Sequence, residues 1–413
     1  MQSQQSTSTE RIFFFDHIRY LMVLLVVVLH SACAYSTFTK WWHVNDINKD
    51  FFDYLLTFLG FFLMPVLFFI AGYFALPSIQ TKRPLEFMKN KLKRLGIPLI
   101  LGVFLVGPYL KYTRTFQSYP ATADYWQKFN ENINYAVTFR TGLIRSTGQF
   151  QHHYFWFISL LLLFFVIFAL FQKSGFMFVP TSKQASKKSI LLAFLISGLL
   201  ASFIALFIQG ILGKTVILGD PWLTVAGLIQ FRPTVIAMYV ICFILGVFAY
   251  SRNWFKGGGV PGHYLFWASL SVVLFGLFIK VRDAITQIVF SGSNVPTHYS
   301  VVYAGIRHFI VFTFLLMFIS FSVKHWNRSS KLNNALSASS YHIYLVHMVF
   351  VVTIQSFLKQ WIFGMVYFKF ILVALGSVLL SLCISHFSIR PYPKRSIIGI
   401  IVLAGILFII LGP

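Results

Sequence analysis

The sequence predicts an all-α integral membrane protein, a bundle of 10–11 transmembrane helices with a cytoplasmic N-terminus. Hydrophobic residues make up 57% of the 413 residues and charged residues 11%, and the mean hydropathy is +0.75. Most of such a chain has to avoid water, which excludes a soluble multidomain protein. The apolar residues gather in runs of about 20, the length of helix that crosses a bilayer. Lys and Arg gather between these runs.

Ten long apolar runs and a shorter eleventh give the expected helices in order. They lie near residues 13–35, 51–75, 96–112, 154–172, 189–209, 232–250, 263–280, 300–323, 339–358, 367–388 and 396–412. We expect residues 1–395 to form one transmembrane domain and residues 396–413 to add a C-terminal apolar helix, a candidate eleventh span. The segments after the even-numbered spans hold more Lys and Arg than the longer segments after the odd-numbered spans. Because cytoplasmic segments carry the excess of Lys and Arg, the N-terminus is expected inside.

The net charge of +24 comes from 34 Lys and Arg against 10 Asp and Glu. These cations lie largely in short loops between spans, and no soluble basic domain carries them, so we expect membrane lipids as partners and no nucleic acid. The three cysteines lie within apolar runs without the spacing of metal ligands, and no H-E-x-x-H, P-loop or G-x-S-x-G motif occurs. No metal site is expected.

The first span carries four ionisable side chains: Asp16, His17, Arg19 and His30. Each costs at least about 2.5–3.5 kcal/mol at membrane depth, so each is a candidate functional residue. Arg19 and His30 are 11 residues apart, which places them on one helix face about 16 Å apart along the axis. Asp16, three residues before Arg19, is placed to pair with it. His17 points to the opposite side.

A basic segment follows the second span. Its six cations are Lys82, Arg83, Lys89, Lys91, Lys93 and Arg94. Such a cluster can bind anionic headgroups or a phosphorylated ligand, although topology and lipid contact alone also account for it. Within the second span, the Ala71-Gly72 pair allows close approach of another helix.

Polar residues also line one side of the ninth span. Ser340, Tyr344 and His347 follow i, i+4, i+7 spacing, while His342 points away. In the eighth span, Arg307 lies beside His308, and a buried Arg needs an acceptor such as Asp16 or a substrate oxygen.

Three further features lie near the span ends. Arg232 and Lys369 are close enough to the ends of their spans to snorkel to the interface. The loop 111–152, which is polar and aromatic, is expected outside the membrane, where it can contact a large polar partner.

Five sequence blocks together resemble the acyltransferase family 3 membrane enzymes. They are the Arg-x10-His pair of the first span, FFIAGYF, the basic segment ending KRLGIP, HHYFWFISLLLLF and SASSYHIYLVHM. The resemblance runs from about residue 11 to 390 and is greatest to the branch that modifies periplasmic glucans with succinyl groups. Two features depart from the family pattern: His153 precedes Trp156 by three residues where the family usually has two, and the apolar segment 396–412 exceeds the usual ten spans.

The resemblance implies transfer of an acyl group, acetyl or succinyl, from cytoplasmic acyl-CoA to a hydroxyl of an extracytoplasmic glycan or lipid-linked saccharide, at a bacterial inner membrane. Acyl-CoA is then a co-substrate, and no cofactor is permanently bound. An alcohol needs a base during attack on a thioester, and a histidine, with a pKa near 6.5, suits that role. The expected catalytic residues are His30 as base, Arg19 toward the donor and Asp16 supporting Arg19. Lys91, Lys93 and Arg94 are expected to bind acyl-CoA, and Arg307, Tyr344, His347 and Trp156 to bind substrate.

Two alternatives remain at the level of sequence. Asp16 and Arg19 could be an ion pair that joins helices, with His30 an interfacial histidine. A transporter or flippase for an anionic solute or lipid-linked sugar would also place ions in its helices. Transporters commonly show inverted repeats and paired broken helices, and the absence of both from this sequence favours the enzyme.

Overall fold

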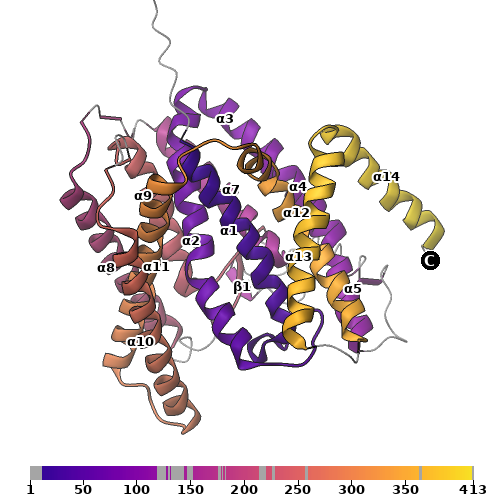
Figure 1. Ribbon diagram of the computed structural model, residues 1–413, viewed down its shortest axis with the longest axis horizontal. Coiled ribbons are helices and arrows are strands. Elements are labelled where there is room, and N and C mark those ends of the chain that lie inside the picture. The colour runs from indigo at the N-terminus through magenta and orange to yellow at the C-terminus, as the bar shows by residue number, and fades with distance from the viewer. Residues whose placement is uncertain are drawn as a thin grey trace, which may run out of the picture.

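The computed structural model describes residues 12–118, 127–128, 131, 144–146, 152–174, 178, 180–181, 183–213, 220–225, 228–255, 259–361 and 365–411. Across these residues, ten helical segments are long and apolar enough to cross a membrane. They are Phe13–Tyr35, Asp50–Gln80, Pro84–Phe116, His153–Lys173, Lys187–Leu212, Pro233–Ser251, Tyr264–Phe290, Thr297–His325, Lys331–Lys359 and Val366–Ile389. The predicted all-α membrane bundle and its ten long spans are thereby confirmed (Figure 1).

Helix α1 (Phe13–Ala32) lies inside the bundle and packs against α2 (Asp50–Gln80) and α12 (Lys331–Lys359). The Tyr20 hydroxyl donates to the Asn333 side chain over 3.0 Å near the start of both α1 and α12, and His30 meets His347 further along both. The two helices therefore run side by side in the same direction, as expected for two odd-numbered spans.

Glycine permits a close helix contact between α2 and α9 (Pro233–Ser251). A Cβ atom on Gly72 would lie 2.0 Å from the Phe243 carbonyl oxygen, and one on Gly246 would lie 2.1 Å from the Phe69 carbonyl oxygen. The predicted close approach at Gly72 is confirmed, and Gly246 is its counterpart on the facing helix.

The third span differs from its prediction. It begins at Pro84 rather than near residue 96, and it alternates α-helix with π-helical turns: α3 (Pro84–Lys91), a turn at Leu92–Gly96, α4 (Ile97–Leu101), a turn at Gly102–Val106 and α5 (Gly107–Ser118). The basic segment, expected to connect two spans, is itself helical from Pro84 onward, and Pro84 takes the first helical position, where its missing N–H costs nothing. Hydropathy did not indicate this part of the helix because its many charged residues interrupt the apolar pattern.

The remaining helices complete the bundle around this centre. They are α7 (Trp156–Lys173), α8 (Lys187–Leu212), α10 (Tyr264–Phe290), α11 (Thr297–His325) and α13 (Val366–Ile384). α11 packs against α8 and α10, and α12 packs against α13. Large apolar side chains such as Leu199, Phe203 and Leu375 are exposed on the outer helices, as a lipid-facing surface requires.

A small antiparallel sheet, absent from the sequence prediction, lies beside the start of α7. Its strands β1 (Ile144–Ser146), β2 (Leu223–Val225) and β3 (Ile229–Phe231) pair in that order. The side-chain oxygen of Gln230 accepts a hydrogen bond from the His152 backbone N–H over 2.8 Å. The sheet thus fixes the turn His153–Phe155 that opens the fourth span.

Helix α14 (Pro393–Leu411) follows a π-helical turn at Ser385–Ile389 and leads away from the bundle in Figure 1. A helix over the predicted segment 396–412 is thus found, while its crossing of the membrane stays a prediction. Most of the loop 111–152, with its predicted contact surface, lies outside the described residues.

Candidate active site

Two histidines from α1 and α12 meet inside the bundle. His30 Nδ1 lies 2.9 Å from His347 Nε2, and His347 Nδ1 lies 2.8 Å from the Tyr344 carbonyl oxygen. A carbonyl oxygen can only accept, so His347 Nδ1 carries a proton, and its Nε2 is then the acceptor for His30 Nδ1–H in the neutral pair. This assignment from partners leaves the Nε2 lone pair of His30 as the basic site.

Aromatic and amide groups hold the His30 ring in place. The Trp42 ring stacks on it with centroids 5.6 Å apart, and Tyr154 approaches edge-on at 6.4 Å. Gln355 accepts from the Trp42 indole N–H over 2.9 Å and donates to the Ser31 carbonyl over 3.1 Å. His30 is therefore oriented by three elements rather than by its own helix alone.

Tyr344, an expected substrate residue, makes a structural contact. Its hydroxyl donates to the Tyr154 carbonyl, while the Tyr154 hydroxyl donates to the Leu345 carbonyl over 2.5 Å. This reciprocal pair ties the turn His153–Phe155 to α12. His342, on the other side of α12, lies 3.0 Å from the Ser385 hydroxyl, so the predicted division of that helix into two faces is confirmed.

The predicted Asp16–Arg19 ion pair is present, with Arg19 Nη2 at 2.7 Å from Asp16 Oδ1. The Arg19 side chain is 36% exposed, so its guanidinium is accessible from outside the bundle. The Ser337 hydroxyl donates to the Asp16 carbonyl over 3.4 Å, which places the pair against the first turns of α12.

The basic segment lies at this same end of the bundle, hereafter the basic end. Tyr341 of α12 donates to the Arg94 carbonyl over 2.8 Å. Lys93 and Arg94 are exposed, whereas the Lys91 ammonium lies 4.1 Å from the centroid of the Phe165 ring. Of the three expected acyl-CoA residues, the structure therefore leaves Lys93 and Arg94 the more accessible.

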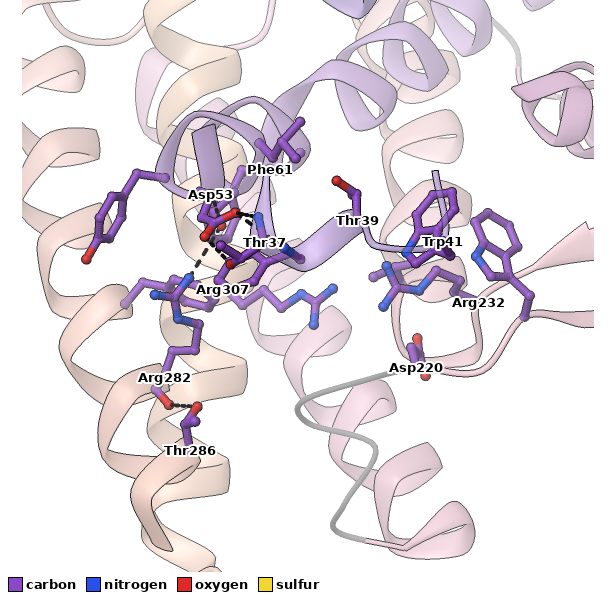
Figure 2. A pocket seen from close by; sticks show the side chains of 18 of the residues that line it. Thr37, Thr39, Trp41, Asp53, Phe61, Asp220, Arg232, Arg282, Thr286 and Arg307 are labelled. Carbon is purple, nitrogen blue, oxygen red and sulfur yellow. Dashed lines mark hydrogen bonds between the residues drawn. The ribbon is translucent and has the colours of Figure 1, made fainter. Parts of the chain in front are cut away.

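A cavity of about 1380 Å³ opens at the opposite end, hereafter the cavity end (Figure 2). The first half of α2 lines it, and since α2 ends beside the basic segment, the two ends lie on opposite sides of the bundle. Its acidic, basic and histidine lining residues are His43, Asp50, Asp53, Lys111, Arg114, Lys128, Glu131, His153, Asp220, Arg232, Arg282, Asp283, Arg307 and His308. This surface is strongly polar for a membrane protein, which suits a hydrophilic ligand.

His30 does not line this cavity, but its neighbours reach it. Trp42 stacks on His30, and the His43 ring next to it lines the cavity at 5.4 Å from the His153 ring centroid. His43 Nδ1 donates to the Leu110 carbonyl over 2.9 Å. Burial lowers the pKa of His43 to about 4, a shift that the bond to Leu110 opposes and the charge of Arg114 increases, so the ring is neutral at pH 7.

His153 lines the cavity despite its departure from the family spacing. Its backbone φ is +48°, a conformation that is uncommon outside glycine, and its Nε2 is buried without a hydrogen-bond partner. His43 was not predicted as a site residue. The run Trp41-Trp42-His43, in a short loop directly after the span that ends near His30, is the signal that could have found it.

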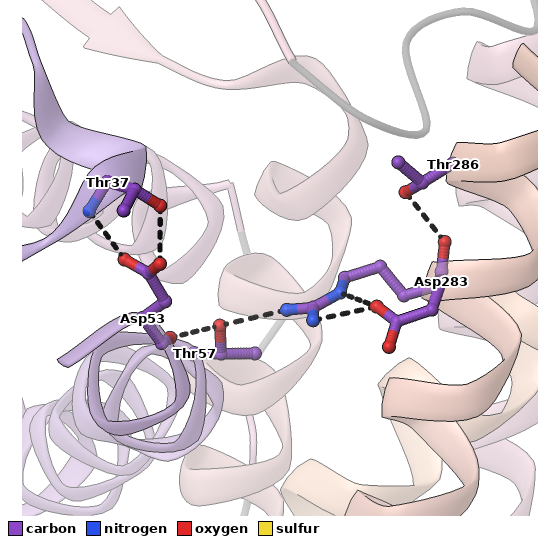
Figure 3. A network of polar contacts seen from close by, with 6 residues as sticks. Thr37, Asp53, Thr57, Asp283 and Thr286 are labelled. Atoms are coloured by element: carbon purple, nitrogen blue, oxygen red, sulfur yellow. Dashed lines mark hydrogen bonds and ion pairs between the residues drawn. The ribbon is translucent and has the colours of Figure 1, made fainter. Parts of the chain in front are cut away.

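A polar network anchors the loop that carries Trp42 and His43 (Figure 3). Asp53 accepts from the Thr37 backbone N–H over 2.8 Å and from the hydroxyls of Ser36 and Thr37. The Thr57 hydroxyl donates to the Asp53 carbonyl over 2.7 Å and accepts from Arg282 over 3.4 Å. The loop is therefore fixed to α2 and, through Arg282, connected to α10.

Two sequence predictions about cations are wrong, and one alternative for a third cation is excluded. Lys369 does not snorkel: its ammonium is buried and lies 2.8 Å from Asp46, a partner that the sequence could not reveal. Arg232 faces the cavity rather than the lipid interface. Arg307 also faces the cavity, at the end opposite Asp16, so the predicted acceptor Asp16 is excluded.

Trp156, an expected substrate residue, lies behind the cavity wall. Its ring is 5.4 Å from Trp222 and 5.6 Å from Tyr239, both of which line the cavity. Among the described residues, no three His, Cys, Asp or Glu side chains gather in a way that could hold a metal ion.

Known proteins resemble this chain over most of its length. A family model described as an acyltransferase domain matches residues 12–390. Glucans biosynthesis protein C of Escherichia coli (strain SMS-3-5 / SECEC) is 34% identical over 99 residues, 24% of this chain and 25% of that protein. The protein of the same name from Salmonella heidelberg (strain SL476) is 27% identical over 258 residues, 59% of this chain and 60% of that protein.

These curated relatives are thus matched over less than two thirds of their length, and no solved structure matches the chain. The family model, in contrast, covers all ten spans. The chain therefore belongs to the acyltransferase 3 family of membrane acyltransferases.

Proposed function

We propose that this protein moves an acyl group, acetyl or succinyl, from acyl-CoA to a hydroxyl of a glycan on the other side of a bacterial inner membrane. His30 is the general base of the proposed reaction. The observation that carries the proposal is the chain of contacts from His30 through His347 to the Tyr344 carbonyl, which leaves His30 Nε2 unprotonated and aims the ring. A base with an oriented lone pair is what an alcohol needs to attack a thioester.

The proposed step balances without any further reagent. The glycan oxygen attacks the thioester carbonyl, the O–H proton passes to His30 Nε2, a C–O bond forms and the C–S bond breaks. His30 then returns the proton to the departing CoA thiolate. His347 stabilises the transient imidazolium by keeping its Nε2 lone pair toward His30 Nδ1–H.

The two ends of the bundle suit two different substrates. Arg19 lies about 16 Å from His30 along α1, toward the basic end, where Lys93 and Arg94 offer exposed cations to CoA phosphates. The cavity end offers a polar space large enough for sugar residues, reaching His43 and His153 beside the Trp42 and Tyr154 contacts of His30. With the N-terminus cytoplasmic, the basic end faces the cytoplasm and the cavity faces outward.

The test is acyl transfer by purified protein in detergent, with labelled acyl-CoA and a set of glycans. Loss of a general base lowers the rate by about 10²–10⁴-fold, so the transfer rate of His30→Ala is expected to be lower than that of wild type by this factor. His17→Ala is the matched control, since it removes a histidine from another side of α1 and should retain transfer. Size-exclusion profiles establish that both variants fold.

A transporter predicts a different outcome. Wild-type protein that never consumes acyl-CoA with any acceptor, yet moves an anionic solute or lipid-linked sugar in liposomes, would contradict the enzyme. Full transfer by His30→Ala would leave an acyltransferase but reject His30 as its base.

A further inference from the structure

Arg232 and Arg307 line the cavity without a carboxylate partner among the described residues. Arg307 makes no hydrogen bond or ion pair with the described residues, and its guanidinium carbon lies 5.9 Å from the Tyr303 ring centroid. Arg232 makes no side-chain hydrogen bond within the same residues, and its Nε is buried without a partner. Figure 2 shows both side chains directed into the cavity from different walls, α11 for Arg307 and the start of α9 for Arg232.

Two other cations of the cavity are already compensated. Arg282 Nη2 lies 2.8 Å from Asp283, and the Lys128 ammonium lies 3.0 Å from Glu131. Carboxylates are therefore present in the cavity, and Asp283 and Glu131 pair with other cations than Arg232 and Arg307. The unpaired state of Arg232 and Arg307 is a local property and does not reflect a shortage of acids.

Asp220 is close enough to act electrostatically on Arg232, but it forms no ion pair with either arginine. Its Oδ2 accepts from the Thr234 backbone N–H over 2.8 Å and from the Thr234 hydroxyl over 2.5 Å, and its Oδ1 has no hydrogen-bond partner. Burial lowers the pKa of Arg232, and the like charge of Arg307 lowers it further, against the opposing effect of Asp220. Two like charges held together in a partly buried wall are unfavourable unless an anion enters between them.

We propose that Arg232 and Arg307 form a subsite for an oxyanion, a carboxylate or phosphate group, carried by a substrate of the acyl transfer. Guanidinium groups match both anions with paired N–H donors, and the tyrosines Tyr239 and Tyr303 complete the wall. The proposal rests on the proposed function for the identity of the ligand, but the subsite itself does not. The oxyanion comes either from the far end of a dicarboxylic acyl group or from an anionic substituent of the acceptor glycan.

Anion binding is tested first, without any reaction. Inorganic phosphate and succinate should each raise the melting temperature of the detergent-solubilised protein with a saturable midpoint, compared with chloride at equal ionic strength. Arg232→Gln and Arg307→Gln should each raise the anion concentration at the midpoint by about 10- to 100-fold, the range for loss of a charge-assisted hydrogen bond. Arg282→Gln removes a paired cation from the same cavity and should keep the wild-type midpoint.

Folding of the variants does not decide the outcome. Arg232→Lys and Arg307→Lys keep the charge but lose the planar pair of donors, so their midpoints should lie between those of wild type and the glutamine variants. They replace a glutamine variant that is too unstable to measure. Wild-type protein that phosphate and succinate stabilise no more than chloride does would overturn the subsite. So would variants at both arginines that bind these anions as wild type does.

Two pairs of substrates then identify the source of the oxyanion. Succinyl-CoA and butyryl-CoA have four-carbon acyl groups that differ in the terminal carboxylate, and a neutral glucan oligosaccharide is compared with the same oligosaccharide bearing a phosphate ester. A preference for one charged member that falls about 10- to 100-fold in Arg307→Gln assigns the source. Unchanged preferences in both pairs would reject a substrate role. Anion binding that depends on the arginines in a protein that transfers no acyl group would contradict the proposed function and leave the subsite intact.

Discussion

The chemistry of the proposed site depends, at the scale of residues, on one nitrogen of His30. The sequence placed Arg19 and His30 on one face of a helix and paired Asp16 with Arg19, because both statements follow from helical geometry within α1. It could not pair His30 with His347, since the two lie 317 positions apart in the chain. The direction of the free lone pair follows only from the second contact, to the Tyr344 carbonyl.

His347 is accordingly expected to be a positioning residue. His347→Ala should lower kcat about 10- to 100-fold with little change in the KM for acyl-CoA, because the His30 ring loses the acceptor that fixes its tautomer. His347→Gln, whose amide oxygen can accept from His30 Nδ1–H, should recover part of the rate. Steady-state kinetics of both variants check this.

His342→Ala serves as the control for this prediction. It removes a histidine from the same helix but from the face that contacts Ser385. Equal loss of kcat in His342→Ala and His347→Ala, or no recovery by glutamine, would show that His347 acts only through the stability of α12.

At the scale of elements, the helices were predictable and the contacts between them largely were not. Ten spans follow from local hydropathy, and close packing at Gly72 follows from the absence of a side chain. The helical state of the basic segment was hidden by its charges. The small sheet was hidden because its three strands are three residues each and pair across the fourth and fifth spans.

The buried ion pair between Lys369 and Asp46 ties α13 to the loop that carries Trp42 and His43. Both side chains are almost inaccessible, at 3% and 8% exposure. Lys369→Met leaves a buried carboxylate alone, and breaking such a pair costs about 3–5 kcal/mol, so the melting temperature in detergent should fall sharply. The double variant Lys369→Met, Asp46→Asn should recover most of the loss, and a double variant as unstable as the single one would reject this account.

Gly72 offers a second test at this scale. Gly72→Ala is expected to destabilise the protein because the new Cβ would collide with the Phe243 carbonyl oxygen and push α2 and α9 apart. Gly60→Ala is the matched control on α2, since nothing lies within 4 Å of its Cβ position and alanine favours a helix by about 1 kcal/mol. Thermal unfolding of the two variants should move in opposite directions.

At the scale of the molecule, cations at one end and a polar cavity at the other divide the bundle. The cations at one end were predictable from the sequence, because Lys and Arg are more frequent in the segments on the cytoplasmic side. The cavity was not predicted, because its lining comes from six helical spans and the loops between them. Arg232 and Arg307, whose surroundings were not predicted from the sequence, come together only in the assembled bundle.

The basic end should determine affinity for acyl-CoA. Neutralising Lys93 and Arg94 to glutamine is expected to raise the KM for acyl-CoA several-fold at low salt, with a smaller effect at high salt, because exposed cations attract phosphates through screened fields. Lys394→Gln with Arg395→Gln removes the same charge from the start of α14 as a control. Equal KM values for both double variants would favour topology and lipid contact alone for the basic segment.

The most direct test of transfer across the bundle uses proteoliposomes in which the protein has one known orientation. Labelled acyl-CoA is supplied on the side of the basic end and a glycan acceptor on the side of the cavity, and acylated glycan is measured. Product is expected with wild-type protein and His17→Ala, about 10²–10⁴-fold less product with His30→Ala, and no product when the substrates exchange sides. Product that forms equally with the substrates exchanged, or with His30→Ala, would contradict the proposed transfer.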